Sequence, residues 1–200
     1  MIEAPPAVDR VRYPVAISYL NRLSELLLLI PEERMAAAID LLIEAQDRGS
    51  RVYIMGNGGS AATSAHLAND LMKKTSHVPG MRPLRAFAVS DNVPLLTAWS
   101  NDVAYESAFA EYLAGVLEED DVVIGISASG NSPNILNGLA VARACGARTI
   151  GLVGFDGGAA EGMVDAAIHV PSFDYGLVED AHMAVGHAIS DAVRQALDAD

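Results

Sequence analysis

Residues 52–60 read Val-Tyr-Ile-Met-Gly-Asn-Gly-Gly-Ser, four apolar residues followed by a glycine-rich turn. The pattern after this turn, to about residue 74, is helical. The same order recurs at 122–145, where Val-Val-Ile-Gly-Ile precedes Ser-Ala-Ser-Gly-Asn-Ser and a second helical stretch. A unit of buried strand, Gly/Ser loop and helix therefore occurs twice, which predicts two similar units around one crevice.

Three more short apolar runs end in turns, at 86–89, 149–153 and 167–170. Strands that alternate with helices pair in parallel, and strands without polar alternation indicate a sheet covered on both faces. The sequence therefore predicts an α/β fold, in which a doubly wound parallel sheet is sandwiched by helices.

The two ends of the chain are predicted to be helical. Leu, Ala and Ile dominate 15–30 and 35–46, and an amphipathic pattern runs over 177–197. No low-complexity linker divides the chain, so we expect its 200 residues to form a single domain. Within it, residues 1–48 are expected to form an N-terminal helical extension, and residues 49–200 the α/β core with its C-terminal helix.

The charge balance excludes several classes of function. The chain has 13 Lys and Arg against 26 Asp and Glu, a formal net charge of −13. Because nucleic acid and anionic membranes attract basic surfaces, we expect neither as a partner. With 51% hydrophobic residues, the chain is not expected to be disordered.

The expected location is the cytoplasm. The one cysteine, Cys145, excludes an intrachain disulfide and fits a reducing compartment. No segment approaches the ~20 apolar residues of a membrane span. The first residues also lack the basic and then apolar layout of a signal peptide.

Both Gly/Ser loops are predicted to bind an anion. In open parallel sheets, ligands bind beyond the carboxyl ends of the strands, and each loop lies there, before a helix N-terminus with unpaired N–H groups. The second loop adds the hydroxyls of Ser127, Ser129 and Ser132, and Gly130 permits a close approach of its backbone. Either loop alone is also consistent with an ordinary turn and helix cap, but two loops with this serine density favour an anion site.

The first loop lacks residues that two common classes of nucleotide-binding loop require. Gly56 to Ala61 fits the dinucleotide pattern G-x-G-x-x-A, which calls for an acidic residue about 20 positions on. This chain has Lys73, Lys74, Arg82 and Arg85 in that stretch. No Gly-Lys-Ser/Thr follows the glycines, which excludes a Walker loop. A small phosphorylated ligand therefore fits better than a dinucleotide.

Two helices carry side chains suited to catalysis or metal binding. His66 and Asp70 are four residues apart and share a helical face. On the last helix, Glu179 and His187 lie off the apolar stripe, whereas His182 lies at its edge and is predicted to be a packing histidine. From spacing alone, His66 and Asp70 form either a surface pair or part of a metal or catalytic site, and spacing does not show whether the two helices meet.

The two loops together resemble those of the sugar isomerase (SIS) family, which bind the phosphate of a phosphosugar. The resemblance covers nearly the whole chain, including Asp91, Asn101-Asp102 and the stretch 154–158. It implies the SIS fold and a phosphorylated sugar as ligand. The residues that it assigns to substrate binding are Asn57, Gly58, Gly59, Ser60, Ser127, Ser129, Asn131, Ser132 and Glu179.

The same resemblance implies a catalytic pair, a metal and an assembly. The family's catalytic carboxylate and histidine match Asp70 and His187. Some members bind zinc, and the matching ligands are His66, Asp70, Glu179 and His187. The family forms tetramers with shared sites, so we expect a homotetramer in which the last helix can serve a neighbour's site. Asp70 replaces the family's glutamate, Glu179 its glutamine, and Lys74 stands where arginine is frequent.

Within the family the chain resembles the branch that isomerises sedoheptulose 7-phosphate, which predicts an aldose–ketose isomerase. Asp70, or Glu179, would move a proton between C1 and C2, and His187 would act on the oxygens. An isomerase for another phosphosugar is one alternative. The other is a non-catalytic SIS protein: a phosphosugar-binding regulator, or a replication-initiator-associating adaptor, which residues 91–98 also resemble. Adaptors usually lack counterparts of Asp70 and His187, which favours the enzyme.

Overall fold

The computed structural model describes residues 13–199. At its centre is a five-stranded sheet with the strand order β2-β1-β3-β4-β5, in which all neighbours are parallel. The strands are β1 (Arg51–Gly56), β2 (Arg85–Ala88), β3 (Val122–Ser127), β4 (Arg148–Val153) and β5 (Ala166–His169). Each of the five predicted strands falls on one of these, which confirms the doubly wound α/β architecture.

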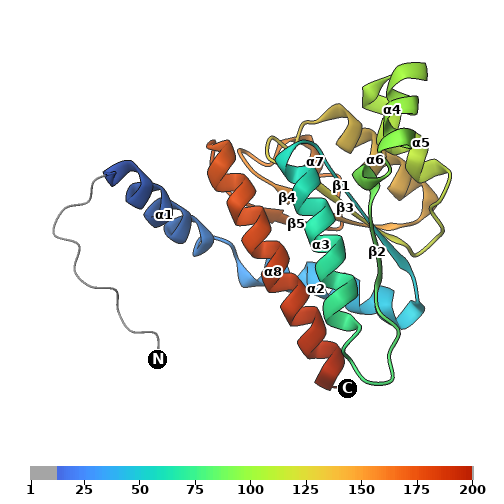
Figure 1. Cartoon of the computed structure of the whole chain (residues 1–200), viewed down its shortest axis with the longest axis horizontal. Coiled ribbons are helices and arrows are strands. Elements are labelled where there is room, and N and C mark those ends of the chain that lie inside the picture. Colours follow the sequence, from blue (N-terminus) through green and yellow to red (C-terminus); the bar gives the residue numbers. More distant parts are fainter. Residues whose placement is uncertain (1–12, 200) are drawn as a thin grey trace.

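Helices cover both faces of the sheet (Figure 1). They are α1 (Pro14–Leu27), α2 (Glu32–Arg48), α3 (Gly59–Thr75), α4 (Val93–Asp102), α5 (Ala108–Ala114), α6 (Pro133–Cys145), α7 (Gly158–Glu161) and α8 (Tyr175–Ala199), with short 3-10 turns at Val89–Asp91 and Tyr105–Ser107. The predicted terminal helices correspond to α1, α2 and α8. Helices α4, α5 and α7 were not predicted from the sequence.

The sheet is buried on both faces because its strands carry apolar side chains in both directions. Alternate residues of a strand point to opposite faces. Val52 and Ile54 of β1 pack with α2, α3 and α8, whereas Tyr53 and Met55 pack with α5 and α6. The two helix layers are therefore fixed to a common scaffold, and the loops at the strand ends are held on it.

The direction of winding reverses between β1 and β3. From this adjacent pair the sheet continues to β2 on one side and to β4 and β5 on the other. A reversal of this kind opens a crevice at the carboxyl ends of the two strands. Gly56 at the end of β1 is in register with Ile126 of β3, so the two predicted anion-binding loops are neighbours.

Helices α3 and α8 lie side by side on one face of the sheet (Figure 1). They run in the same direction, from Gly59 beside Glu179 at one end to Lys74 beside Asp191 at the other. α1 extends away from the sheet. Among residues 13–199, no helix combines the length and apolar character needed to cross a membrane.

His182 of α8 is fully buried, which confirms its predicted place in the core. Neither ring nitrogen has a hydrogen-bond partner among the described residues. Burial lowers the pKa of His182 to about 4, and the nearby carbonyl of Val153 opposes this shift only in part. The ring is therefore neutral in the folded protein at neutral pH.

Buried His182 makes the protein less stable in acid. Between pH 6.5 and 4 the unfolded chain protonates this ring and the folded protein does not, so the free energy of unfolding falls as the pH falls. The pKa difference corresponds to a loss of about 3 kcal/mol across that window. In urea unfolding at a series of pH values, His182→Leu should show a correspondingly shallower decline than the wild type. Parallel declines in the two proteins would contradict this account.

Candidate active site

The loop after β3 gathers three serine hydroxyls at the crevice. The Oγ atoms of Ser127 and Ser132 are 3.0 Å apart and share a hydrogen bond. The N–H of Asn131 donates to the Oγ of Ser129 at 3.2 Å. Ser132 is the N-cap of α6, but its hydroxyl makes no capping bond to that helix. The Ser132 hydroxyl therefore pairs with Ser127, and not with the backbone of α6, in the loop where an anion is expected.

The glycine-rich turn after β4 supports this loop from behind. The side-chain oxygen of Asn131 accepts the N–H of Ala159 at 3.0 Å, and the carbonyl of Gly130 accepts the N–H of Ala160 at 2.9 Å. Gly130 has a φ of +63°, and a Cβ added to it would collide with the carbonyl of Gly157. The loop shape thus depends on a residue without a side chain at position 130.

The two loops predicted to bind an anion are joined by a pair of amides. Asn57, after β1, donates to the Oδ1 of Asn134 at 2.9 Å, and Asn134 donates back to the Oδ1 of Asn57 at 2.8 Å. The Tyr105 hydroxyl donates to the same Asn57 oxygen at 2.7 Å. Asn134 is buried at the start of α6. Ser60, in the first turn of α3, is also buried. Asn134 and Tyr105 were not predicted as site residues, because no sequence motif around either one indicates that its side chain contacts Asn57.

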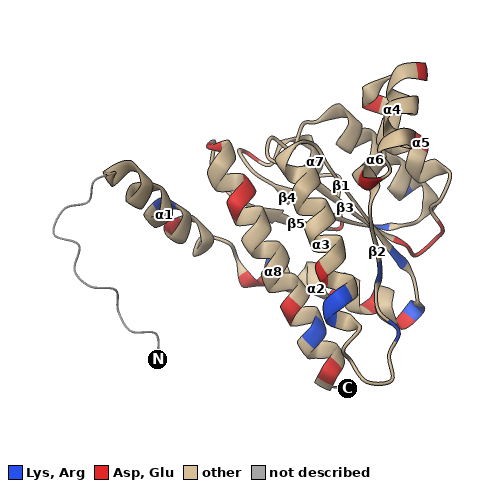
Figure 2. Cartoon of the chain, viewed as in Figure 1, with Lys and Arg blue, Asp and Glu red and all other residues tan. Residues whose placement is uncertain are grey.

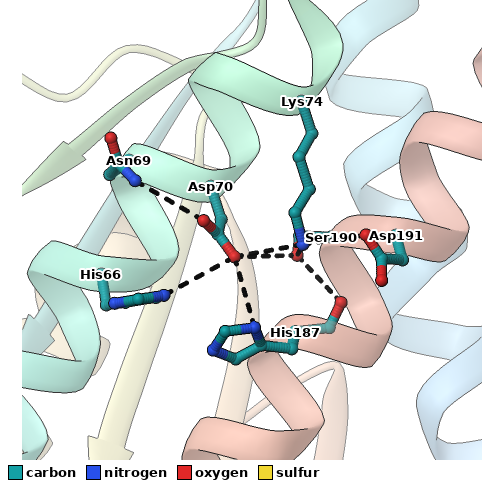
Figure 3. A network of polar contacts seen from close by, with 7 residues as sticks. All are labelled: His66, Asn69, Asp70, Lys74, His187, Ser190 and Asp191. Carbon is teal, nitrogen blue, oxygen red and sulfur yellow. Dashed lines mark hydrogen bonds and ion pairs between the residues drawn. The ribbon is translucent and has the colours of Figure 1, made fainter. Parts of the chain in front are cut away.

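Farther along α3, a carboxylate and two imidazoles meet (Figure 3). The Oδ2 of Asp70 lies 3.8 Å from the Nε2 of His66 and 3.7 Å from the Nδ1 of His187. The two rings are 4.8 Å apart between centroids, and each histidine is about half exposed. Only 13% of the Asp70 side chain is exposed. The structure therefore brings the two predicted catalytic residues together within one chain.

The same oxygen of Asp70 has a cation on its other side. The Nζ of Lys74 lies 3.1 Å from Asp70 Oδ2 and 2.9 Å from Asp191 Oδ1. Burial acts to lower the pKa of Lys74, but its hydrogen bonds to Asp191 and Asp70 outweigh burial and raise it. The hydrogen bond from Lys74 lowers the pKa of Asp191. Asp70 thus lies between the protonated amine of Lys74 on one side and two imidazoles on the other.

The donor set fits a divalent cation. Single ligand atoms of His66, Asp70 and His187 all lie within 4.8 Å of one another. Ligands bound at about 2.0–2.1 Å to one tetrahedral ion are roughly 3.4 Å apart, so small side-chain movements would suffice. Two imidazoles and a carboxylate also match the ligands that zinc takes in catalytic sites with an open position.

Glu179, the fourth predicted ligand, is not part of this cluster. It precedes His187 by eight residues on α8, a rise of about 12 Å along a helix. Its carboxylate packs instead against Gly59, at the start of α3. The partial positive charge of a helix N-terminus favours a carboxylate there. Glu179 therefore lies at the end of α3 next to the first loop predicted to bind an anion.

Comparisons with known sequences and structures show the family to which the chain belongs. The SIS domain matches residues 18–154. The chain belongs to the SIS family. A phosphoheptose isomerase of Pelobacter propionicus is 39% identical over 163 residues, which cover 82% of this SIS protein and 85% of that relative.

Solved structures of related enzymes share the whole architecture. The phosphoheptose isomerase from Francisella tularensis superposes with a TM-score of 0.85 at 26% identity, over 93% of this SIS protein and all of that chain. The one from Neisseria gonorrhoeae gives 0.84 at 26% identity, over 92% and 97% of the two chains. The fold is therefore the SIS fold of the phosphoheptose isomerases.

Proposed function

We propose that this SIS protein is an aldose–ketose isomerase that acts on sedoheptulose 7-phosphate. The observation that carries the proposal is that His66 and Asp70, on the helix that starts at the first predicted anion-binding loop, meet His187 of α8. Ser60 and His66 are six positions apart on α3, a rise of about 9 Å. A sugar phosphate of several carbons can span that distance with its phosphate in the loops. The curated relatives named phosphoheptose isomerase support the substrate.

The residues can carry out the proton transfers of this reaction. In the ketose-to-aldose direction, Asp70 takes a proton from C1 while the C2 carbonyl oxygen gains a proton, which gives an enediol. Return of a proton to C2 and loss of the O1 proton leave the carbonyl at C1. Asp70 carries the proton between the two carbons, and His187 donates protons to the sugar oxygens and accepts protons from them. The serine loops anchor the phosphate, so the reacting carbons stay within reach.

We propose that His66, Asp70 and His187 hold zinc or another divalent ion. A bound ion would supply Lewis-acid stabilisation to the oxygens of the enediol. The position of Glu179 beside Gly59 supports its predicted contact with substrate, rather than coordination alongside the three other ligands of its own chain. In that position it is also the alternative proton carrier for a substrate that extends along α3.

Assembly and location follow from other features. We propose one domain over residues 1–200 and a homotetramer in the cytoplasm. The tetramer is supported by α1, which extends from the body of the protein and exposes Val15, Ile17 and Leu20. Apolar side chains on such a projecting helix favour contact with another subunit. The single cysteine supports a reducing compartment.

Turnover of sedoheptulose 7-phosphate tests the function. We expect the purified protein to convert it to the aldose, measured by NMR, with higher activity when zinc is supplied. A panel of other sugar phosphates, followed by thermal shift and then by NMR, separates the alternatives. Binding without turnover would identify a regulator, turnover of another sugar alone would replace the substrate, and no binding of any would refute the proposal.

A further inference from the structure

The ammonium of Lys74 is fully occupied by protein groups. It has three N–H donors, and three oxygens surround it: Asp191 Oδ1 at 2.9 Å, Ser190 Oγ at 2.8 Å and Asp70 Oδ2 at 3.1 Å. No donor is left over for a substrate oxygen. Lys74 therefore has no free N–H with which to bind a sugar. Its contacts indicate instead that it holds the neighbouring side chains in place.

The contacts of Lys74 cross from α3 to α8 (Figure 3). Ser190 and Asp191 follow His187 by three and four residues, so they occupy the next turn of α8 on the same side. The hydroxyl of Ser190 donates to the His187 carbonyl at 3.0 Å, with Asp70 Oδ2 farther away at 3.5 Å. Lys74 thus connects the helix of Asp70 to the turn next to His187.

This connection acts on one oxygen of Asp70. The Oδ2 atom faces Lys74 on one side and both imidazoles on the other. Among the described residues, Oδ1 has only a 3.5 Å contact with the Asn69 amide. An aspartate side chain can rotate about its two torsions, and a charge-assisted hydrogen bond at Oδ2 selects one orientation. The Asp191 side chain is 60% exposed and binds the Lys74 ammonium on its solvent side.

We propose that Lys74, held by Ser190 and Asp191, is a positioning residue that fixes Oδ2 of Asp70 between His66 and His187. The proposal rests on the proposed isomerase function and extends it, since a carboxylate that moves a proton or binds an ion must be held at a defined place. Figure 2 shows basic residues at the C-terminal end of α3 next to acidic residues on the facing part of α8, in a chain that is otherwise acidic. The last turn of α3 contains two lysines, Lys73 and Lys74, and only Lys74 has these contacts with α8.

The two lysines provide a matched test. We expect Lys74→Met to lower kcat for sedoheptulose 7-phosphate about 10-fold or more, with KM within about 3-fold, because the phosphate loops are untouched. The affinity for zinc should fall about 10- to 100-fold. Lys74→Arg should restore much of both, because a guanidinium can also bridge the two carboxylates. Lys73→Met, at an exposed neighbour on the same helix turn, should change neither quantity.

A crystal structure of Lys74→Met, grown without metal, tests the proposal independently of turnover. We expect Asp70 to leave its place between the imidazoles, and an unchanged carboxylate would overturn the proposal even if the wild type proves to be inactive on the sugar. Unchanged kcat in a correctly folded Lys74→Met enzyme would also overturn it. If Lys74→Met unfolds, the same measurements on Ser190→Ala and Asp191→Asn decide, with smaller changes in the same direction expected.

Discussion

Replacement of Asp70 by asparagine should lower kcat for sedoheptulose 7-phosphate by roughly two to four orders of magnitude, the usual contribution of a positioned acid or base. Asparagine has nearly the same shape and can still accept a hydrogen bond from Lys74, but it cannot take up a proton from carbon. The effect should fall on kcat, because the serine loop proposed to bind the phosphate lies in another part of the site. Steady-state kinetics with an NMR or coupled assay measures both constants.

The neighbouring groups supply the controls for this experiment. His187→Asn should cause a loss of similar size, and the double variant should be little worse than either single one, because the two residues act on one intermediate. Asp40→Asn on α2 and His77→Asn after α3 change exposed residues of the same types and should leave kcat unchanged. If Asp70→Asn keeps kcat within about 3-fold of the wild type, Asp70 is not the proton carrier, and Glu179 becomes the residue to replace.

The fold could be predicted because its information is local. Each strand is a short apolar run that ends at a turn, and burial of such runs on both faces requires parallel pairing with helices between them. The strand order could not be predicted in this way, because it depends on pairs such as Val52 with Val122, which are 70 positions apart in the sequence. The missed helices have a physical reason too: α4, α5 and α7 have only ten, seven and four residues, which is too short for a helical period to be recognised.

The site was predictable only where one segment carries its own signal. The Gly/Ser loops indicate an anion site because a helix N-terminus and hydroxyls occur within a few residues. The spacing of His66 and Asp70 gives a shared helical face, but the partner of that face is set by tertiary packing. The contacts of Asn57 with Asn134 and of Lys74 with Ser190 join residues 77 and 116 positions apart. The contact between α3 and α8 was predicted from the resemblance to the SIS family, and not from the spacing of residues.

Substitution of Gly130 by alanine should damage both stability and substrate binding. At a φ of +63° any other residue is strained, by about 1–2 kcal/mol. The added Cβ would also meet the carbonyl of Gly157, so one of the two loops must move. We expect the free energy of unfolding to fall by about 3 kcal/mol or more. A displacement of about 1 Å in the phosphate-binding loop should lower kcat/KM for sedoheptulose 7-phosphate about 100-fold.

Gly49 allows the two causes to be separated. Gly49 lies at the C-terminus of α2, and its φ is +67°, nearly that of Gly130. An added Cβ would have no atom of residues 13–199 within 4 Å. Gly49→Ala should therefore lower the free energy of unfolding by only the strain of about 1 kcal/mol and leave the kinetics unchanged. In urea unfolding, the difference between the losses of unfolding free energy in the two variants measures the cost of the collision with Gly157. Equal losses in the two variants would show that backbone strain alone acts at Gly130, and that the turn after β4 does not determine the shape of the phosphate-binding loop.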